Sequence, residues 1–290
     1  MALNCMKVSR IVSQNAFRWI AVSTQRNQST VSKKEQLVIT EVNKKTGFAT
    51  LSFNRPSALN SFTLELLQDF SKALDEVENQ KYKGMILTST SSNAFTAGLD
   101  IKELINPDPI RLKELRAVYL DCSLKLYNSL FPTAALINGH AIGGGCFLAM
   151  ACEYRVMLPN FKIGLNETQL GIACPEVAIL ATKNIISSRD SEMALTLGTI
   201  FETDKALDIG LVDEIAKDKA DAMAKCESFM LKFKGVPALA RGITKQLFRK
   251  KIVDLMTENK ERDVENFVNY VLDPISQQNL KAFLHGSKKK

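Results

Sequence analysis

Three consecutive glycines at residues 143–145 stand between a short apolar run and an apolar segment whose pattern predicts a buried helix. Without Cβ atoms, the backbone there can lie close to another group. The free N–H groups at the start of the helix, with the positive end of the helix dipole, can then bind a negative oxygen. A tight strand-to-helix turn would use the same small residues, so the glycines alone leave both interpretations open.

A second glycine loop offers the same groups. Gly98 and Leu99 precede a short helical stretch that Asp100 is placed to cap. Two backbone N–H groups from the two loops, aimed at one point, would stabilise the charge that develops on a carbonyl oxygen during acyl chemistry. Asp100 itself is expected to be a helix cap and not a catalytic group.

One carboxylate, Glu167, lies in the middle of a run, residues 163–172, whose ends are apolar. Burial among apolar groups would raise the pKa of such a carboxyl, which suits a general base. A glutamate at the exposed start of a helix fits the same spacing, and on spacing alone that interpretation is the more frequent one.

The surrounding pattern indicates which elements would position these residues. Alternating or continuous apolar runs predict strands at residues 37–42, 47–53, 84–88, 134–137, 155–158 and 162–164. Helical spacing predicts helices at residues 64–79 and 112–131, a mostly helical chain after Pro175, and a final amphipathic helix marked by Val264, Phe267, Val268 and Val271. This order predicts an α/β domain followed by a helical subdomain.

Composition restricts the possible functions of the 290-residue chain. No apolar run approaches the ~20 residues that a membrane span needs, so we expect none. The net charge of +7 comes almost entirely from residues 1–34, which hold six basic residues and no acidic one. The remainder is close to neutral, which argues against a nucleic-acid partner.

The N-terminal segment has its own signature. Residues 1–34 are acid-free and rich in arginine and serine, and their apolar residues fall on one helical face. This combination is typical of a mitochondrial transit peptide, with a disordered or surface-lying tail as the alternative.

Cysteine and histidine usage gives no metal site. The six cysteines show no paired spacing, so we expect free, mostly buried thiols and no metal. The only histidines are His140, expected to be hydrogen-bonded in the bend, and His285, beside the lysine-rich C-terminus.

Three ordered motifs carry a family resemblance. Residues 94–103 (AFTAGLDIKE) and 137–146 (INGHAIGGGC) resemble the two signature loops of the crotonase (enoyl-CoA hydratase/isomerase) superfamily, and residues 53–60 resemble its opening motif. The similarity runs from about residue 37 to the C-terminal helices. The resemblance implies a ββα superhelix over residues 35–225 and a C-terminal helical trimerisation region over residues 226–290.

The resemblance also implies a site. The N–H groups of Leu99 and Gly144 would form an oxyanion hole, and the implied substrate-binding residues are Ala97, Gly98, Leu99, Asp100, Ile101 and Gly144. The substrate would be an acyl-CoA thioester, so coenzyme A would enter as part of the substrate and no separate cofactor is expected. A homotrimer is expected, with a hexamer as the alternative. Candidates to meet the CoA phosphates are Arg55, Lys245, Arg249, Lys250 and Lys251, although a solvated turn or helix face is the favoured interpretation of each.

Two positions favour one branch of the superfamily. Hydratases resemble this chain but carry two glutamates that activate water, and Phe147 stands at the position of one of them while Glu167 matches the other. A single base suits the shift of a double bond from 3-enoyl-CoA, cis or trans, to 2-trans-enoyl-CoA in the β-oxidation of unsaturated fatty acids. The run at residues 164–172 is similar to that of the mitochondrial isomerases of the superfamily, while Glu176 departs from their pattern. A hydratase or another crotonase-type enzyme remains the alternative, and a non-enzymatic RNA-binding relative is the rival from another class.

Overall fold

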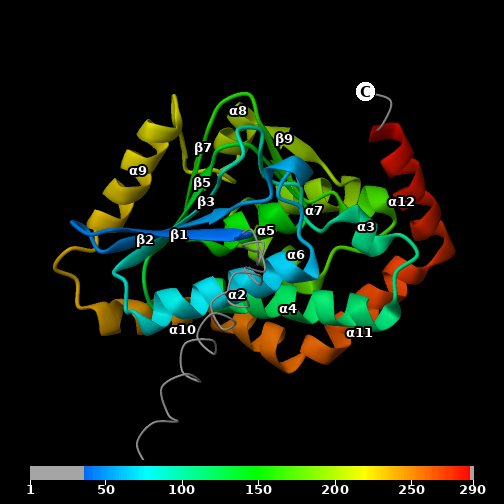
Figure 1. The fold of residues 1–290 in the computed structure, drawn as a ribbon, viewed down its shortest axis with the longest axis horizontal. Helices are drawn as coiled ribbons and strands as arrows, with labels where there is room; N and C mark the ends of the chain where they lie inside the picture. The colour runs from blue at the N-terminus through cyan, green and yellow to red at the C-terminus, as the bar shows by residue number, and fades with distance from the viewer. Residues whose placement is uncertain (1–35, 288–290) are drawn as a thin grey trace, which may run out of the picture. The chain divides into compact units, whose positions relative to one another are not determined.

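Two β-sheets form the centre of the fold in the computed structural model, which describes residues 36–287 (Figure 1). The larger sheet contains β1 (Val38–Asn43), β2 (Phe48–Phe53), β3 (Gly84–Ser89), β5 (Thr133–Ile137), β7 (Tyr154–Met157) and β10 (Glu214–Ile215), in that spatial order. The smaller sheet contains β4 (Ala94–Thr96), β6 (His140–Ile142), β8 (Lys162–Gly164) and β9 (Ile200–Glu202).

Helices connect and cover the sheets. They are α2 (Leu64–Asn79), α3 (Ile101–Leu104), α4 (Pro109–Tyr127), α5 (Gly144–Ala151), α6 (Glu176–Lys183), α7 (Ser188–Leu197), α8 (Thr203–Asp208), α9 (Lys219–Leu231), α10 (Ala238–Glu258), α11 (Lys260–Leu272) and α12 (Pro274–Ser287), with short 3₁₀ turns η1 (Pro56–Ala58) and η2 (Glu167–Leu170).

The chain order builds a repeating ββα unit. Strand β3 is followed by β4, β5 by β6, and β7 by β8, so each repeat gives one strand to each sheet before a helix returns the chain. Within the larger sheet the pairs β2–β3, β3–β5 and β5–β7 are parallel, as helical crossovers require. The predicted ββα superhelix is therefore confirmed.

Period-2 alternation along the strands divides the core in two. In β3, Met85 and Leu87 point into the main core, while Ile86 between them points to the opposite face. On that opposite face the strands pack against Cys226 and Met230 of α9, the helix at the left of Figure 1. Because both faces are covered, these strands read as nearly continuous apolar runs.

The helices begin where capping side chains allow. Asp108 accepts a hydrogen bond from the backbone N–H of Ile110, and Pro109 occupies the first turn, so α4 starts three residues before the predicted helix at 112–131. It ends at Tyr127. The helix that carries Val264 and Phe267 is α11, and it is not the last one, because α12 restarts directly after it at Pro274.

Several sequence predictions fall on the termini. The transit-peptide prediction for residues 1–34 lies outside the described residues. Position 225, the predicted end of the catalytic core, lies inside α9. Within residues 36–287 no helix has the length and apolarity needed to cross a membrane.

The prediction of free, mostly buried thiols is confirmed for the described part of the chain. The five cysteines there are free, and all except the half-buried Cys174 are buried.

Candidate active site

The N–H of Leu99 is left without an acceptor by the way its loop is paired. Phe62 and Leu99 form an isolated parallel bridge, in which the Phe62 N–H donates to Gly98 O at 2.8 Å and the Asp100 N–H donates to Phe62 O at 3.0 Å. In such a bridge the N–H of the central residue points away from the partner strand. Within residues 36–287 the Leu99 N–H has no hydrogen-bond acceptor.

The second loop leaves Gly144 in the same state. The Gly143 N–H donates to Gly164 O at 2.8 Å, whereas Gly144 is the first residue of α5, where a backbone N–H has no partner inside the helix. Gly143 has φ +55° and ψ −125°, a conformation that favours glycine. The described chain offers the Gly144 N–H no acceptor.

The two loops touch each other. A Cβ added to Gly98, whose φ is +81°, would lie 2.6 Å from Ile142 O and 3.2 Å from the Gly144 nitrogen. A real Cβ does not come that close to an oxygen, so only glycine allows this approach. The two unpaired amides therefore belong to loops in direct contact, although β4 and α5 are far apart in sequence.

Glu167 lies beside these loops at the start of η2. Its Oε1 would be 3.4 Å from a Cβ on Gly143, and its Oε2 is fully buried with no hydrogen-bond partner among the described groups. Burial raises the pKa of this carboxyl, opposed by a hydrogen bond to its own backbone and by the charge of Arg116. A carboxylate with one buried oxygen that lacks a hydrogen bond is a strong proton acceptor, as general bases require.

A cavity of about 80 Å³ joins these groups. Of the predicted site residues, Ala97, Gly98, Leu99, Gly144 and Glu167 line it. Asp100 and Ile101 do not. The Asp100 carboxylate instead caps α3, as predicted, by accepting a hydrogen bond from the Lys102 N–H at 3.0 Å. It also pairs with Arg55 at 2.7 Å.

Glu167 is the one carboxylate among the residues that line this cavity. Phe147 also lines it, at the position where the hydratases of the resembled family carry their second glutamate. The lining also includes the apolar side chains of Leu165, Ile172 and Val177. The cavity therefore combines a largely apolar lining with one proton acceptor.

Sequence reasoning missed two lining residues, Arg116 and Tyr119, which lie one turn apart on α4. The Tyr119 hydroxyl donates to Gly144 O at 2.9 Å and so supports the second glycine loop. Arg116 is buried and pairs with Asp263 of α11. The available signal was a charged residue on the apolar face that Leu112, Leu115 and Tyr119 define.

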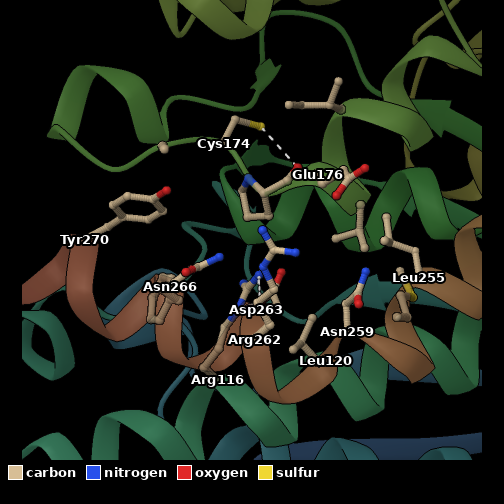
Figure 2. A pocket seen from close by; sticks show the side chains of 16 residues that line it. Arg116, Leu120, Cys174, Glu176, Leu255, Asn259, Arg262, Asp263, Asn266 and Tyr270 are labelled. Atoms are coloured by element: carbon tan, nitrogen blue, oxygen red, sulfur yellow. Dashed lines mark hydrogen bonds and ion pairs between the residues drawn. The ribbon is translucent and has the colours of Figure 1, made fainter.

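A larger cavity of about 240 Å³ adjoins the first and is lined from α4, α6, α10 and α11 (Figure 2). The two cavities share Arg116 and Phe267 among their lining residues. Figure 2 shows Arg116 and Asp263 joined in the wall of this outer cavity. Glu176, the departure noted in the sequence, lines the outer cavity and not the inner one.

The predicted solvated helix face of the basic cluster is wrong for two of its members. Lys245 is buried and donates to Glu153 at 2.9 Å and to Ser129 at 2.8 Å, and burial lowers its pKa to about 8. Arg249 donates to Tyr127 O and Ala151 O at 2.9 and 2.8 Å. These groups hold α10 against α4 and α5, and local spacing did not reveal their distant partners.

The two histidines stand away from the cavity. His140 lies in β6, and its Nδ1 accepts from the Lys162 N–H at 3.0 Å, so the expected hydrogen bond exists, in a strand and not in a bend. Residues 36–287 contain no group of three or more His, Cys, Asp or Glu side chains arranged to hold a metal ion.

Comparison with known proteins places the chain in a class. Residues 43–290 match the family model described as enoyl-CoA hydratase/isomerase, and the chain therefore belongs to this family, the crotonase superfamily. It is 36% identical over 256 residues to mitochondrial enoyl-CoA delta isomerase 1 of Mus musculus, which covers 87% of this chain and 88% of that one.

Solved structures agree with the fold. The crystal structure of human mitochondrial delta3-delta2-enoyl-CoA isomerase superposes with a TM-score of 0.83 at 33% identity, over 88% of this chain and 99% of that one. An enoyl-CoA hydratase from Bacillus halodurans superposes with a TM-score of 0.77 at 25% identity, over 85% of this chain and 99% of that one.

Proposed function

We propose that this protein is an isomerase that converts 3-enoyl-CoA, cis or trans, to 2-trans-enoyl-CoA. One observation carries the proposal: a single buried carboxylate faces a cavity that also receives two unpaired backbone amides. The similarity to the mouse and human isomerases supports the same assignment.

The amides of Leu99 and Gly144 act as the oxyanion hole. When a base removes a proton from C2 of the thioester, negative charge moves onto the thioester oxygen. Two N–H groups that no protein acceptor occupies can bind that oxygen without first breaking a hydrogen bond. Each such donor contributes roughly 3–4 kcal/mol to the transition state.

Glu167 moves the proton. Its carboxylate takes the C2 proton, the electron pair delocalises over the dienolate, and the resulting carboxylic acid returns a proton at C4. The double bond thereby moves from C3–C4 to C2–C3, and Glu167 is regenerated. Coenzyme A is carried in as part of the substrate, so the reaction uses no separate cofactor.

Phe147 argues against hydratase activity. Addition of water to 2-enoyl-CoA needs a group that holds the water and transfers its proton, and a phenyl ring does neither. The apolar ring also keeps water away from the dienolate, where protonation by solvent would compete. We therefore expect crotonyl-CoA hydration to be barely detectable. Robust hydration by the native protein would favour the hydratase alternative.

The direct test is Glu167→Gln. We expect the variant to fold and to bind acyl-CoA but to lose isomerisation by a factor of about one hundred or more, as for a missing general base. Glu192→Gln, which alters an exposed carboxylate on α7, is the matched control and should keep native turnover. Near-native turnover of the Glu167→Gln variant on 3-enoyl-CoA would contradict the assignment.

The cellular setting and the assembly are also part of the proposal. The isomerases of mouse and human are named mitochondrial, and with the transit-peptide pattern of residues 1–34 this supports a mitochondrial matrix location. A homotrimer is supported by exposed apolar side chains at helical spacing on α10, Leu239, Ile243 and Leu247. No nucleic acid is expected as a partner.

A further inference from the structure

A buried ion pair contributes to the wall of the inner cavity, because Arg116 is among the residues that line it. Arg116 of α4 contacts Asp263 of α11 through Nε at 2.7 Å and Nη2 at 2.6 Å. The Arg116 side chain is 5% exposed and the Asp263 side chain 18%. The Arg116 guanidinium also lies 4.8 Å from the ring centre of Phe267 and 5.5 Å from that of Tyr119. Such contacts hold the guanidinium in one place.

The pair is oriented with respect to the site. Arg116 lines both the inner and the outer cavity, whereas Asp263 lines only the outer one (Figure 2). The positive end of the pair therefore faces the cavity that contains Glu167, whereas the negative end, Asp263, does not line that cavity. The field at Glu167 is that of a partly neutralised positive charge.

Glu167 has few other charged neighbours. The titratable groups packed around it are Tyr119 from α4, Cys146 from α5 and Cys174 from the loop after η2, and burial raises the pKa of each. All three are therefore neutral near pH 7. Arg116 is the one cation among the residues that line the inner cavity.

Burial works against the proposed base. A carboxylate in an apolar cavity with one oxygen that lacks a hydrogen bond tends to take up a proton, and a protonated Glu167 cannot accept another from C2. A full positive charge beside Glu167 would have the opposite effect. It would lower the pKa of the carboxyl and so make it a weaker base. Arg116 lies between these two cases, because its counter-ion Asp263 partly neutralises its charge.

We propose that the Arg116–Asp263 ion pair is a positioning unit that keeps Glu167 ionised in the free enzyme and sets the lower end of the pH range in which the enzyme works. The inference rests on the proposed function, since it concerns the base of that reaction. Arg116 does not exchange protons with the substrate; it acts through Glu167.

The test uses the acid limb of the pH profile of kcat/KM, which reports the base in the free enzyme. Arg116→Met removes the cation, so the limb moves to higher pH. Asp263→Asn removes the neutralising anion, so the limb moves to lower pH. In the double variant both charges are gone, and the limb lies between those of the native enzyme and Arg116→Met. Arg116→Lys keeps the charge and stays near the native limb.

A matched control separates this effect from a general change in net charge. Arg189→Met also removes one arginine from an ion pair, but that pair with Glu192 is exposed on α7. Its acid limb should coincide with the native one. If Arg116→Met does not fold, the double variant, which leaves no unpaired buried charge, still moves the limb to higher pH, and Arg116→Lys keeps it near the native one.

The outcomes are distinguishable. A native enzyme that isomerises 3-enoyl-CoA while the limbs of all variants coincide overturns the inference, as does a limb that moves to higher pH in Asp263→Asn. A native protein without isomerase activity overturns the proposed function instead. In that case the titration of Glu167, followed by its ¹³C carboxyl resonance and assigned with Glu167→Gln, still orders the variants in the same sequence if the inference is correct.

Discussion

Replacement of Gly98 by alanine tests whether the contact between the two glycine loops is what makes the oxyanion hole. The new Cβ would lie 2.6 Å from Ile142 O and 3.2 Å from the Gly144 nitrogen. A carbon–oxygen contact must open by several tenths of an ångström to become tolerable, and both atoms belong to backbone that a rotamer change cannot move. The loops must therefore separate, and the Leu99 and Gly144 amides no longer converge on one point.

The expected loss follows from the energy of one donor. If the displacement removes the equivalent of one N–H contact, about 3–4 kcal/mol of transition-state stabilisation disappears, and kcat falls by roughly a hundredfold to a thousandfold. The φ of +81° adds about 1–2 kcal/mol of backbone strain, which lowers the melting temperature as well.

Gly235→Ala is the control that separates strain from loop contact. Gly235 also has a positive φ, +88°, but no atom lies within 4 Å of the added Cβ. It should lose stability like Gly98→Ala and keep its turnover. The assay is steady-state isomerisation of 3-enoyl-CoA together with thermal unfolding of both variants. A folded Gly98→Ala enzyme with native kcat would refute the proposed role of the loops.

Two further predictions concern stability. Burial raises the pKa of Glu167 in the folded state above its ordinary value of 4.5, so the folded state loses stability as pH rises through the folded-state pKa. Glu167→Gln should therefore have a higher melting temperature than the native protein near pH 7.5. The difference should vanish below about pH 4. Equal melting points at neutral pH would contradict the burial of this carboxyl. Glu153→Gln leaves Lys245 and Arg241 without their shared counter-ion and should cost about 3–5 kcal/mol in urea unfolding, whereas Glu192→Gln should cost under ~1 kcal/mol.

Features that depend on neighbouring residues in the sequence could be predicted. Strands β1, β2, β3, β5, β7 and β8 were found because apolar residues alternate or run continuously, whereas the short strands β4, β6, β9 and β10 were not predicted. Helix α2 was predicted with the bounds that the structure has, Leu64–Asn79. The two glycine loops were found because both need residues without a Cβ where backbone meets backbone. Glu167 was selected by its run and by the family resemblance, and its buried Oε2 agrees with the expected apolar setting.

Features that depend on distant partners were missed. Arg116 pairs with a counter-ion 147 residues later in the chain, in α11, and no local sequence pattern indicates such a pairing. The same holds for Lys245, whose neighbours Lys250 and Lys251 suggested a solvated face although its own side chain turns inward to Glu153. The bend expected around His140 is a strand because β6 pairs with both β4 and β8.

Two side chains on adjacent turns of helix α4 stabilise the groups that carry out the proposed reaction. Arg116 reaches the carboxylate side of the cavity, and Tyr119 reaches the carbonyl of Gly144. A single-residue insertion or deletion in the first part of α4 would rotate everything beyond it by about 100°, and both side chains would leave the cavity together. Among natural or engineered length variants of this chain, active ones should therefore accept changes in the surface turn between β1 and β2 far more readily than any change of length within the opening turns of α4.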